Sequence, residues 1–110
     1  MTLPAAVSAS RNEARAVAPK LIELTETLVY PDIWERPGLS KRDRSLITLA
    51  ALTALYRPHQ LKGHTEGALA NGVTREEIGE LITHLAFYAG WPSAMSAAKV
   101  VKQVYEEAKA

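Results

Sequence analysis

The side chains best suited to proton transfer in this chain are its histidines, because imidazole titrates near neutral pH. His64 stands three residues after Leu61 and four before Ala68, so in a helix it lies on the apolar face. Such a histidine is either a core residue whose ring a neighbour hydrogen-bonds, or an acid–base group that faces a pocket. The pattern alone favours the core role for His64. His59, near the start of the same helix, is expected to face solvent.

A third histidine lies in a row of chemically useful side chains. At 100° per residue, one narrow sector of a helix contains two acids, an imidazole, a phenol and an indole: Glu77, Glu80, His84, Tyr88 and Trp91. This sector is either a solvated face, on which Glu80 and His84 form an ordinary i,i+4 pair, or the lining of a pocket or subunit seam. The two aromatic residues argue against the solvated face, because large aromatic rings prefer at least partial burial.

Two arginines are placed where they could hold an anionic ligand. Arg44 and Arg57 flank the two ends of an otherwise apolar helix, and a guanidinium binds a carboxylate bidentately. The alternative is an ion pair with an acidic residue elsewhere in the chain. The sequence has no His-Glu-x-x-His motif, and His59 and His64 are poorly spaced as ligands on one helix face, so no metal site is expected.

Helix-start and helix-stop signals indicate which elements position these residues. A capping box at Ser10-x-x-Glu13 predicts the start of the first helical stretch, and Pro19 predicts a kink or restart within it. Tyr30-Pro31 predicts its end. After a Pro- and Gly-bearing connection, Ser40 is expected to cap a helix that is apolar nearly all round. Such a helix is buried on several sides, so we expect it to be the central one.

The second half of the chain contains three more helix signals. Pro58 suits the first turn of a helix that Asn71-Gly72 ends. A capping box at Thr74-x-x-Glu77 opens the next helix, Gly90 ends it, and Pro92 begins the last. No segment alternates with period two for long enough to form a strand. The sequence therefore predicts an all-α, compact bundle of about five to six helices in a single domain, residues 1–110.

Composition narrows the class of protein. The 110 residues carry 13 Lys and Arg against 12 Asp and Glu, so nothing electrostatic points to nucleic acid or a membrane surface as partner. No apolar run approaches the roughly 20 residues that span a bilayer. No signal peptide is recognisable, and a cytoplasmic protein is expected. The chain has no cysteine, so it forms neither a disulfide nor a thiolate site.

An ordered series of motifs over about residues 34–101 resembles the carboxymuconolactone decarboxylase family, which includes the alkyl hydroperoxidase D-like thiol enzymes. The motifs are Arg36-Pro37-Gly38-Leu39, Arg42-Asp43-Arg44-Ser45-Leu46, Leu61-x-x-His64, Ala68-x-x-Asn71-Gly72-Val73-Thr74, Glu77-Ile78-x-Glu80 and Tyr88-Ala89-Gly90-x-Pro92. The resemblance implies an alkyl hydroperoxidase D-like helical fold. His64 matches the family histidine.

The chain looks like the decarboxylase-type branch of this family rather than the thiol branch. The thiol branch carries two cysteines where this chain has Arg57 and Gln60, and a glutamate at what corresponds to Ser45. Because a thiolate attacks the peroxide in that branch, thiol peroxidase activity is not expected here.

The resemblance implies a carboxy-lyase that needs no cofactor and acts on a small unsaturated lactone with two carboxylates, in aromatic-compound degradation. Loss of carbon dioxide leaves a dienolate, which the protein must stabilise and reprotonate. The resemblance assigns His64 as hydrogen-bond donor or acid. We add our own inferences for the other candidates: His84 oriented by Glu80 as a second acid, Arg44 or Arg57 on the spectator carboxylate, and Tyr88 and Trp91 as an apolar wall.

The same resemblance implies a homo-oligomer (a dimer, trimer or hexamer, often a trimer of dimers). Helices that are apolar over more than one face support this expectation, because a chain of 110 residues buries only part of its surface. Two other functions stay open. The chain is a non-thiol paralogue with a different lactone or β-keto-type acid as substrate, or it is a non-catalytic oligomer that binds a small acid.

Overall fold

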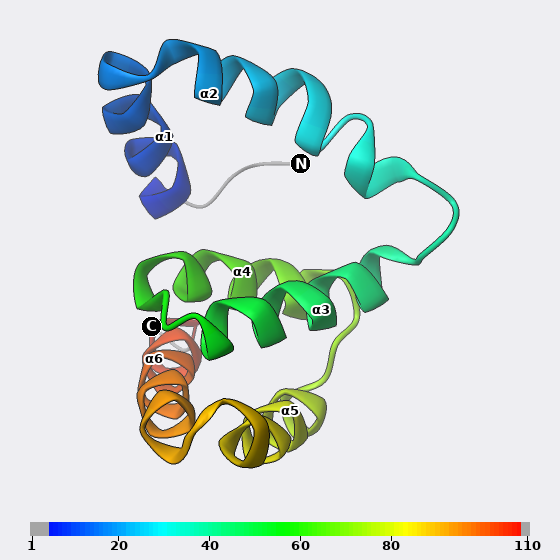
Figure 1. Ribbon diagram of the computed structural model, residues 1–110, viewed down its shortest axis with the longest axis vertical. Coiled ribbons are helices and arrows are strands. Elements are labelled where there is room, and N and C mark those ends of the chain that lie inside the picture. Colours follow the sequence, from blue (N-terminus) through cyan, green and yellow to red (C-terminus); the bar gives the residue numbers. More distant parts are fainter. Residues whose placement is uncertain (1–4, 109–110) are drawn as a thin grey trace. The chain divides into compact units, whose positions relative to one another are not determined.

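The computed structural model describes residues 5–108, which form six α-helices, a π-helical segment and a 3-10 turn (Figure 1). Within these residues no strand occurs, which confirms the predicted all-α class. The chain divides into two compact units, the first ending at Lys41 and the second beginning at Arg42. The expectation of a single domain over residues 1–110 stays a prediction.

The first unit consists of α1 (Ala5–Val17), α2 (Pro19–Leu24), the π-helical segment η1 (Thr25–Val29) and the 3-10 turn η2 (Ile33–Glu35). Pro19 begins α2 as predicted, because proline needs no hydrogen-bond acceptor at the first helical position. The predicted start at Ser10 was wrong. Helix α1 begins at Ala5, since the alanine-rich segment before Ser10 favours helix strongly enough to extend it.

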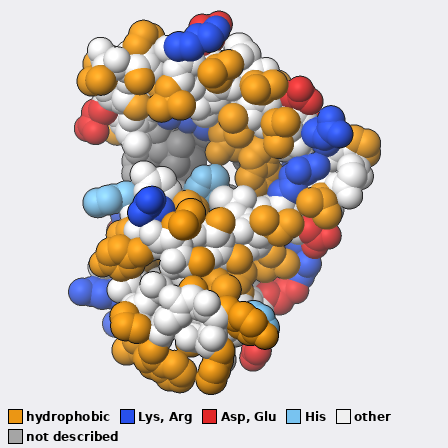
Figure 2. All heavy atoms as spheres, viewed as in Figure 1, with side chains coloured by type: hydrophobic (Ala, Val, Ile, Leu, Met, Phe, Trp, Pro, Cys, Tyr) orange, Lys and Arg blue, Asp and Glu red, His pale blue; other side chains and the backbone are white. Residues whose placement is uncertain are grey.

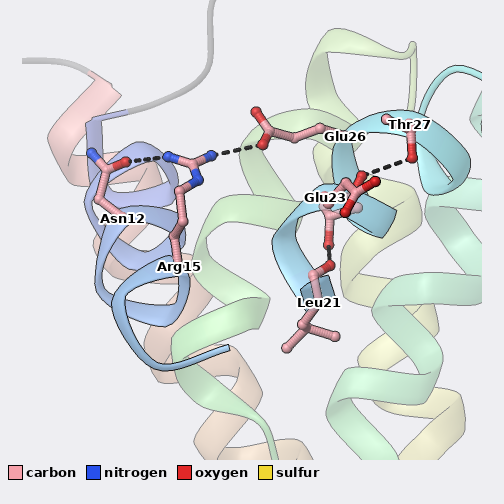
Figure 3. A network of polar contacts seen from close by, with 7 residues as sticks. Asn12, Arg15, Leu21, Glu23, Glu26 and Thr27 are labelled. Carbon is pink, nitrogen blue, oxygen red and sulfur yellow. Dashed lines mark hydrogen bonds and ion pairs between the residues drawn. The ribbon is translucent and has the colours of Figure 1, made fainter. Parts of the chain in front are cut away.

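Polar and aromatic contacts hold the first unit together. Arg15 donates to Asn12 Oδ1 at 2.7 Å and to Glu26 Oε1 at 2.7 Å, which joins α1 to η1 (Figure 3). The Tyr30 ring stacks on Trp34 with centroids 5.8 Å apart, and the Arg11 guanidinium lies 5.0 Å from the Tyr30 ring centroid. Through Tyr30, these contacts tie Trp34 in η2 to Arg11 on α1.

The second unit contains α3 (Lys41–Ala54), α4 (Pro58–Ala70), α5 (Arg75–Ala89) and α6 (Trp91–Ala108). The predicted stops are confirmed at Gly72 and Gly90, whose φ angles of 95° and 106° suit glycine. The capping box that opens α5 is also confirmed, because Thr74 and Glu77 exchange side-chain and backbone hydrogen bonds.

Helix α6 lies at the centre of this unit, where it packs against both α4 and α5. Its buried face is made of small and β-branched residues, which allow close approach of the neighbouring helices: Ala94, Ala97, Val101 and Val104. The core cluster joins this face to the other helices and to the loop before α5: Leu49, Leu61, Ala68, Val73, Ile78, Ala97 and Val101.

The prediction that α3 is the central helix was wrong. Only Ser45, Leu49 and Thr53 of α3 are buried, whereas Ile47 is 56% exposed. An apolar pattern predicts that a face is covered, but it does not distinguish coverage by the same chain from coverage by another. Helix α3 is instead tied to its neighbours by side chains at its start. Arg42 forms an ion pair with Glu77 on α5.

Tyr105 on α6 provides a test of how this unit is packed. Its hydroxyl is buried without a hydrogen-bond partner, and the Arg75 guanidinium lies 4.2 Å from its ring centroid. Burial raises the pKa of the Tyr105 hydroxyl above 10.0, an effect that the Arg75 charge partly opposes.

We predict that Tyr105→Phe leaves the free energy of unfolding at pH 7 unchanged or raises it by up to about 1 kcal/mol, because an orphaned hydroxyl is removed and the ring stays. A raised pKa favours the protonated folded state. The native protein should therefore lose stability as pH rises through 10 toward the folded pKa, and the variant should lose less. Urea unfolding at pH 7 and above pH 10 measures both effects. An unchanged alkaline slope in the variant would contradict the assignment.

Candidate active site

A groove between α3 and α5 is the larger of the hollows described in the second unit, with a volume of about 480 Å³. Its lining is mostly apolar, with three residues from α3 and four from α5: Leu46, Ile47, Ala50, Glu80, Leu81, His84 and Leu85. Both helices contribute residues at spacings of three or four, so one face of each helix forms one wall. The groove is within the size range of small-molecule sites.

The structure places Glu80 and His84 together in the lining of this groove, from the helix sector in which the sequence analysis grouped them. Among the described contacts they form no hydrogen bond or ion pair with each other. The His84 ring instead stacks on Tyr88, with centroids 4.8 Å apart and planes at 27°. Tyr88 is therefore the residue in contact with the imidazole, one helical turn further along α5, and it is 79% exposed.

Beyond the groove, four exposed side chains form what we call the aromatic patch: Phe87, Tyr88, Trp91 and Met95. The Trp91 ring meets Phe87 edge-on, with centroids 5.6 Å apart and planes at 84°. Hydrophobic side chains gather on the visible surface where α5 is followed by α6 (Figure 2). The sequence analysis expected Tyr88 and Trp91 to be at least partly buried, but among the described residues they are 79% and 59% exposed. Phe87 and Met95 were missed by sequence reasoning, although Met95 lies one helical turn after Trp91 on α6. The predicted sector from Glu77 to Trp91 is interrupted, because Gly90 ends α5 and Trp91 begins α6.

His64 lies in the middle of α4 and is half-buried. Its helix buries Leu61 and Ala68 on the face that the sequence analysis assigned to it. His64 lines neither the groove nor the smaller cavity described below. The structure assigns His64 neither of the two roles considered for it, because it is only half-buried and lines neither hollow.

The two candidate arginines lie at opposite ends of α3. Arg57 is the N-cap residue of α4, and its Nη1 donates to the Leu55 carbonyl at 2.9 Å and to the Tyr56 carbonyl at 3.4 Å. Its guanidinium is held over the turn between α3 and α4, where it lines a cavity of about 10 Å³. Arg44, on the first turns of α3, is half-buried. Neither arginine lines the groove that contains His84.

The positions that correspond to the thiol-branch residues carry side chains of a different chemical type. Ser45 is buried, and its Oγ accepts a hydrogen bond from Asn71 Nδ2 at 3.0 Å. Gln60 is exposed on the first turn of α4.

Among the described residues, no three acidic or histidine side chains are grouped as a metal site would require. Of the helices that the structure describes, none has the length and apolar character to cross a membrane.

Comparison of the sequence with known proteins assigns the chain to a family. Residues 19–103 match the carboxymuconolactone decarboxylase family, and the chain belongs to it. The match confirms the resemblance, and it begins at residue 19, whereas the motifs predicted a start near Trp34. The missed segment contains α2 and η1, whose residues carry no catalytic motif that sequence reasoning could have used.

Three curated relatives resemble the chain over most of its length. It is 41% identical to the 4-carboxymuconolactone decarboxylase of Acinetobacter baylyi over 78 residues, which cover 71% of this chain and 58% of that protein. It is 38% identical to the nitrosuccinic acid decarboxylase npaB of Metarhizium robertsii over 85 residues, covering 77% and 59%. It is 36% identical to an uncharacterized 15.0 kDa protein of Paracoccus denitrificans over 77 residues, covering 67% and 57%. The chain therefore spans less than two thirds of the length of each relative.

Ser45 offers a test of the site's chemistry. Replacing it with alanine removes the acceptor for Asn71 and should lower the free energy of unfolding by about 1 kcal/mol. Ser45→Glu, which introduces the thiol-branch residue, should cost more than about 3 kcal/mol, because it places a larger, charged carboxylate at a position that is 3% exposed. Chemical denaturation of both variants measures the difference. Equal stability of Ser45→Glu and the native chain would show that this position can accept the thiol-branch glutamate.

Proposed function

We propose that the chain is a cofactor-independent carboxy-lyase that acts on a small carboxylated lactone of the 4-carboxymuconolactone class. Family membership carries this proposal, together with two relatives that are named as decarboxylases. The groove between α3 and α5 supports it for one of the two candidate acids, because its apolar lining includes the imidazole of His84 and the carboxylate of Glu80, whereas His64 lies outside this lining.

The proposed reaction needs only groups that this chain possesses. The C–C bond to the departing carboxylate breaks, carbon dioxide leaves, and the electron pair moves through the double bond onto the lactone carbonyl. An apolar wall favours this step, because a carboxylate loses its charge there. A protonated imidazole then donates its proton to a carbon of the dienolate, which re-forms the lactone carbonyl and leaves the imidazole neutral. His64 is the proposed acid, from its match to the family histidine, and His84 is the second candidate.

Paired histidine variants test the proposal and assign the acid. With 4-carboxymuconolactone generated in situ, His64→Gln should lower kcat/KM by about 100-fold, the scale of a lost acid–base group. If His84 only lines the groove, His84→Gln should lower kcat/KM less than His64→Gln does. If His84 is the acid, His84→Gln should lower kcat/KM more than His64→Gln does. His59→Gln is the matched control, because His59 is exposed on the same helix as His64. Release of carbon dioxide and product absorbance are followed together. Absence of turnover by the assembled native protein would reject the decarboxylase proposal, and retained carboxylate binding would then favour the binding-protein alternative.

We also propose that the chain forms a homo-oligomer through the aromatic patch. Each of its four side chains is at least 59% exposed, two of them (Phe87 and Trp91) are in contact, and large exposed apolar surface marks interaction sites. The trimer-of-dimers arrangement and the cytoplasmic location predicted from the sequence stay proposals as well. A C₂ contact would bring the same patch of two copies together.

The aromatic patch is tested by its effect on native mass. Phe87→Ser combined with Trp91→Ser should lower the mass measured by sedimentation equilibrium, because both rings lose their apolar area. Tyr56→Ser is the control, since Tyr56 is 57% exposed but lies outside the patch. An unchanged mass in the double variant, with a helical circular dichroism spectrum like that of the native chain, would place the subunit contact elsewhere.

A further inference from the structure

A second cavity lies where α3 ends, α4 begins and the first turns of α6 pass. Its free space is about 10 Å³, roughly that of one water-sized atom. Its lining combines apolar residues with several polar ones: Leu52, Thr53, Tyr56, Arg57, Pro58, Leu61, Ser93, Ser96 and Ala97. All of these residues belong to the second unit, and none of them lines the groove that contains His84.

Thr53 differs from the other threonines that the structure describes within helices. Thr48, Thr65 and Thr83 each donate their hydroxyl to the carbonyl four residues earlier, at 2.7–2.8 Å. The two threonines of η1 do the same at 2.8–2.9 Å. Thr53 is 2% exposed, and its Oγ1 has no hydrogen-bond partner. A hydroxyl that lacks the bond available to it within its own helix, and that is buried beside a cavity, indicates an unfilled partner position.

The electrostatics of the cavity favour an anion. No acidic residue is among its lining residues, and Arg57 is held there by its two bonds to backbone carbonyls. Helix α4 starts beside the cavity with no side-chain cap, so the backbone N–H groups of His59 and Gln60, which directly follow the lining residue Pro58, have no acceptor within the helix. The start of a helix carries partial positive charge, which attracts anions.

We propose that this cavity, next to the start of α4, is a subsite for one oxygen atom of a carboxylate. This oxygen accepts a hydrogen bond from the hydroxyl of Thr53, in the last turn of α3. The available space admits one oxygen, so the rest of the ligand would extend past the exposed side chains of Tyr56 and Arg57. The hydroxyls of Ser93 and Ser96 complete the set of donors in the lining. The subsite shares no lining residue with the groove that contains His84, so this proposal does not depend on the proposed function.

Titration of the isotope-labelled chain with acetate, at constant ionic strength, tests the subsite by NMR. The amides of Thr53, His59 and Gln60 should shift saturably, and acetamide, which is neutral but of similar shape, should bind far more weakly. Thr53→Val keeps the side-chain shape without the hydroxyl, and it should weaken acetate binding by about tenfold. Thr65→Val is the matched control, because Thr65 is equally buried but its hydroxyl is bonded within its own helix.

Each outcome decides the matter. Equal binding of acetate by Thr53→Val and by the native chain, or equal binding of acetamide and acetate, would overturn the proposal. If Thr53→Val folds poorly, Thr53→Ala provides the test, because it also removes the hydroxyl and should weaken acetate binding by about tenfold, whereas Thr53→Ser should retain it. The measurement needs no turnover. A chain that binds acetate here without decarboxylating the lactone would refute the proposed function alone, and an active chain indifferent to Thr53→Val would refute the subsite alone.

Discussion

The burial of one stripe of α6 between α4 and α5 is the constraint on which the second unit depends. Alanine and valine on this stripe let the helices approach closely, and the core residues of α4 and α5 complete the contact. This packing fixes the direction of both helices that carry the candidate histidines. The α5 wall of the groove is therefore positioned by α6, none of whose residues lines the groove.

Most helix boundaries were predictable from the sequence because local chemistry determines them. Proline at the first turn of α2 and α4, glycine at φ angles near 100°, and a reciprocal capping box at α5 act within a few residues of the chain. The place of α3 was not predictable in the same way. Its apolar face is only partly covered by the described chain, and hydrophobic periodicity does not say what covers a face.

Sequence periodicity predicted part of the candidate site. It placed Glu80 and His84 on one face of α5, and they do line one groove. It did not predict that Tyr88 stacks on the imidazole, or that Arg57 is engaged by the turn before α4. It also gave no sign of the orphaned hydroxyl of Thr53, because a missing hydrogen bond arises from the packing of three helices rather than from residue type. The role of His64 rests on family likeness, since its position in α4 fits more than one role.

The aromatic patch links the stability of the fold to its surroundings. Any molecule that covers these rings binds only the folded chain, so it shifts the folding equilibrium by mass action. When the covering molecule is another copy of the chain, the melting temperature becomes a function of protein concentration. A dilute sample and a concentrated one would then differ in thermal stability without any difference in sequence or solvent.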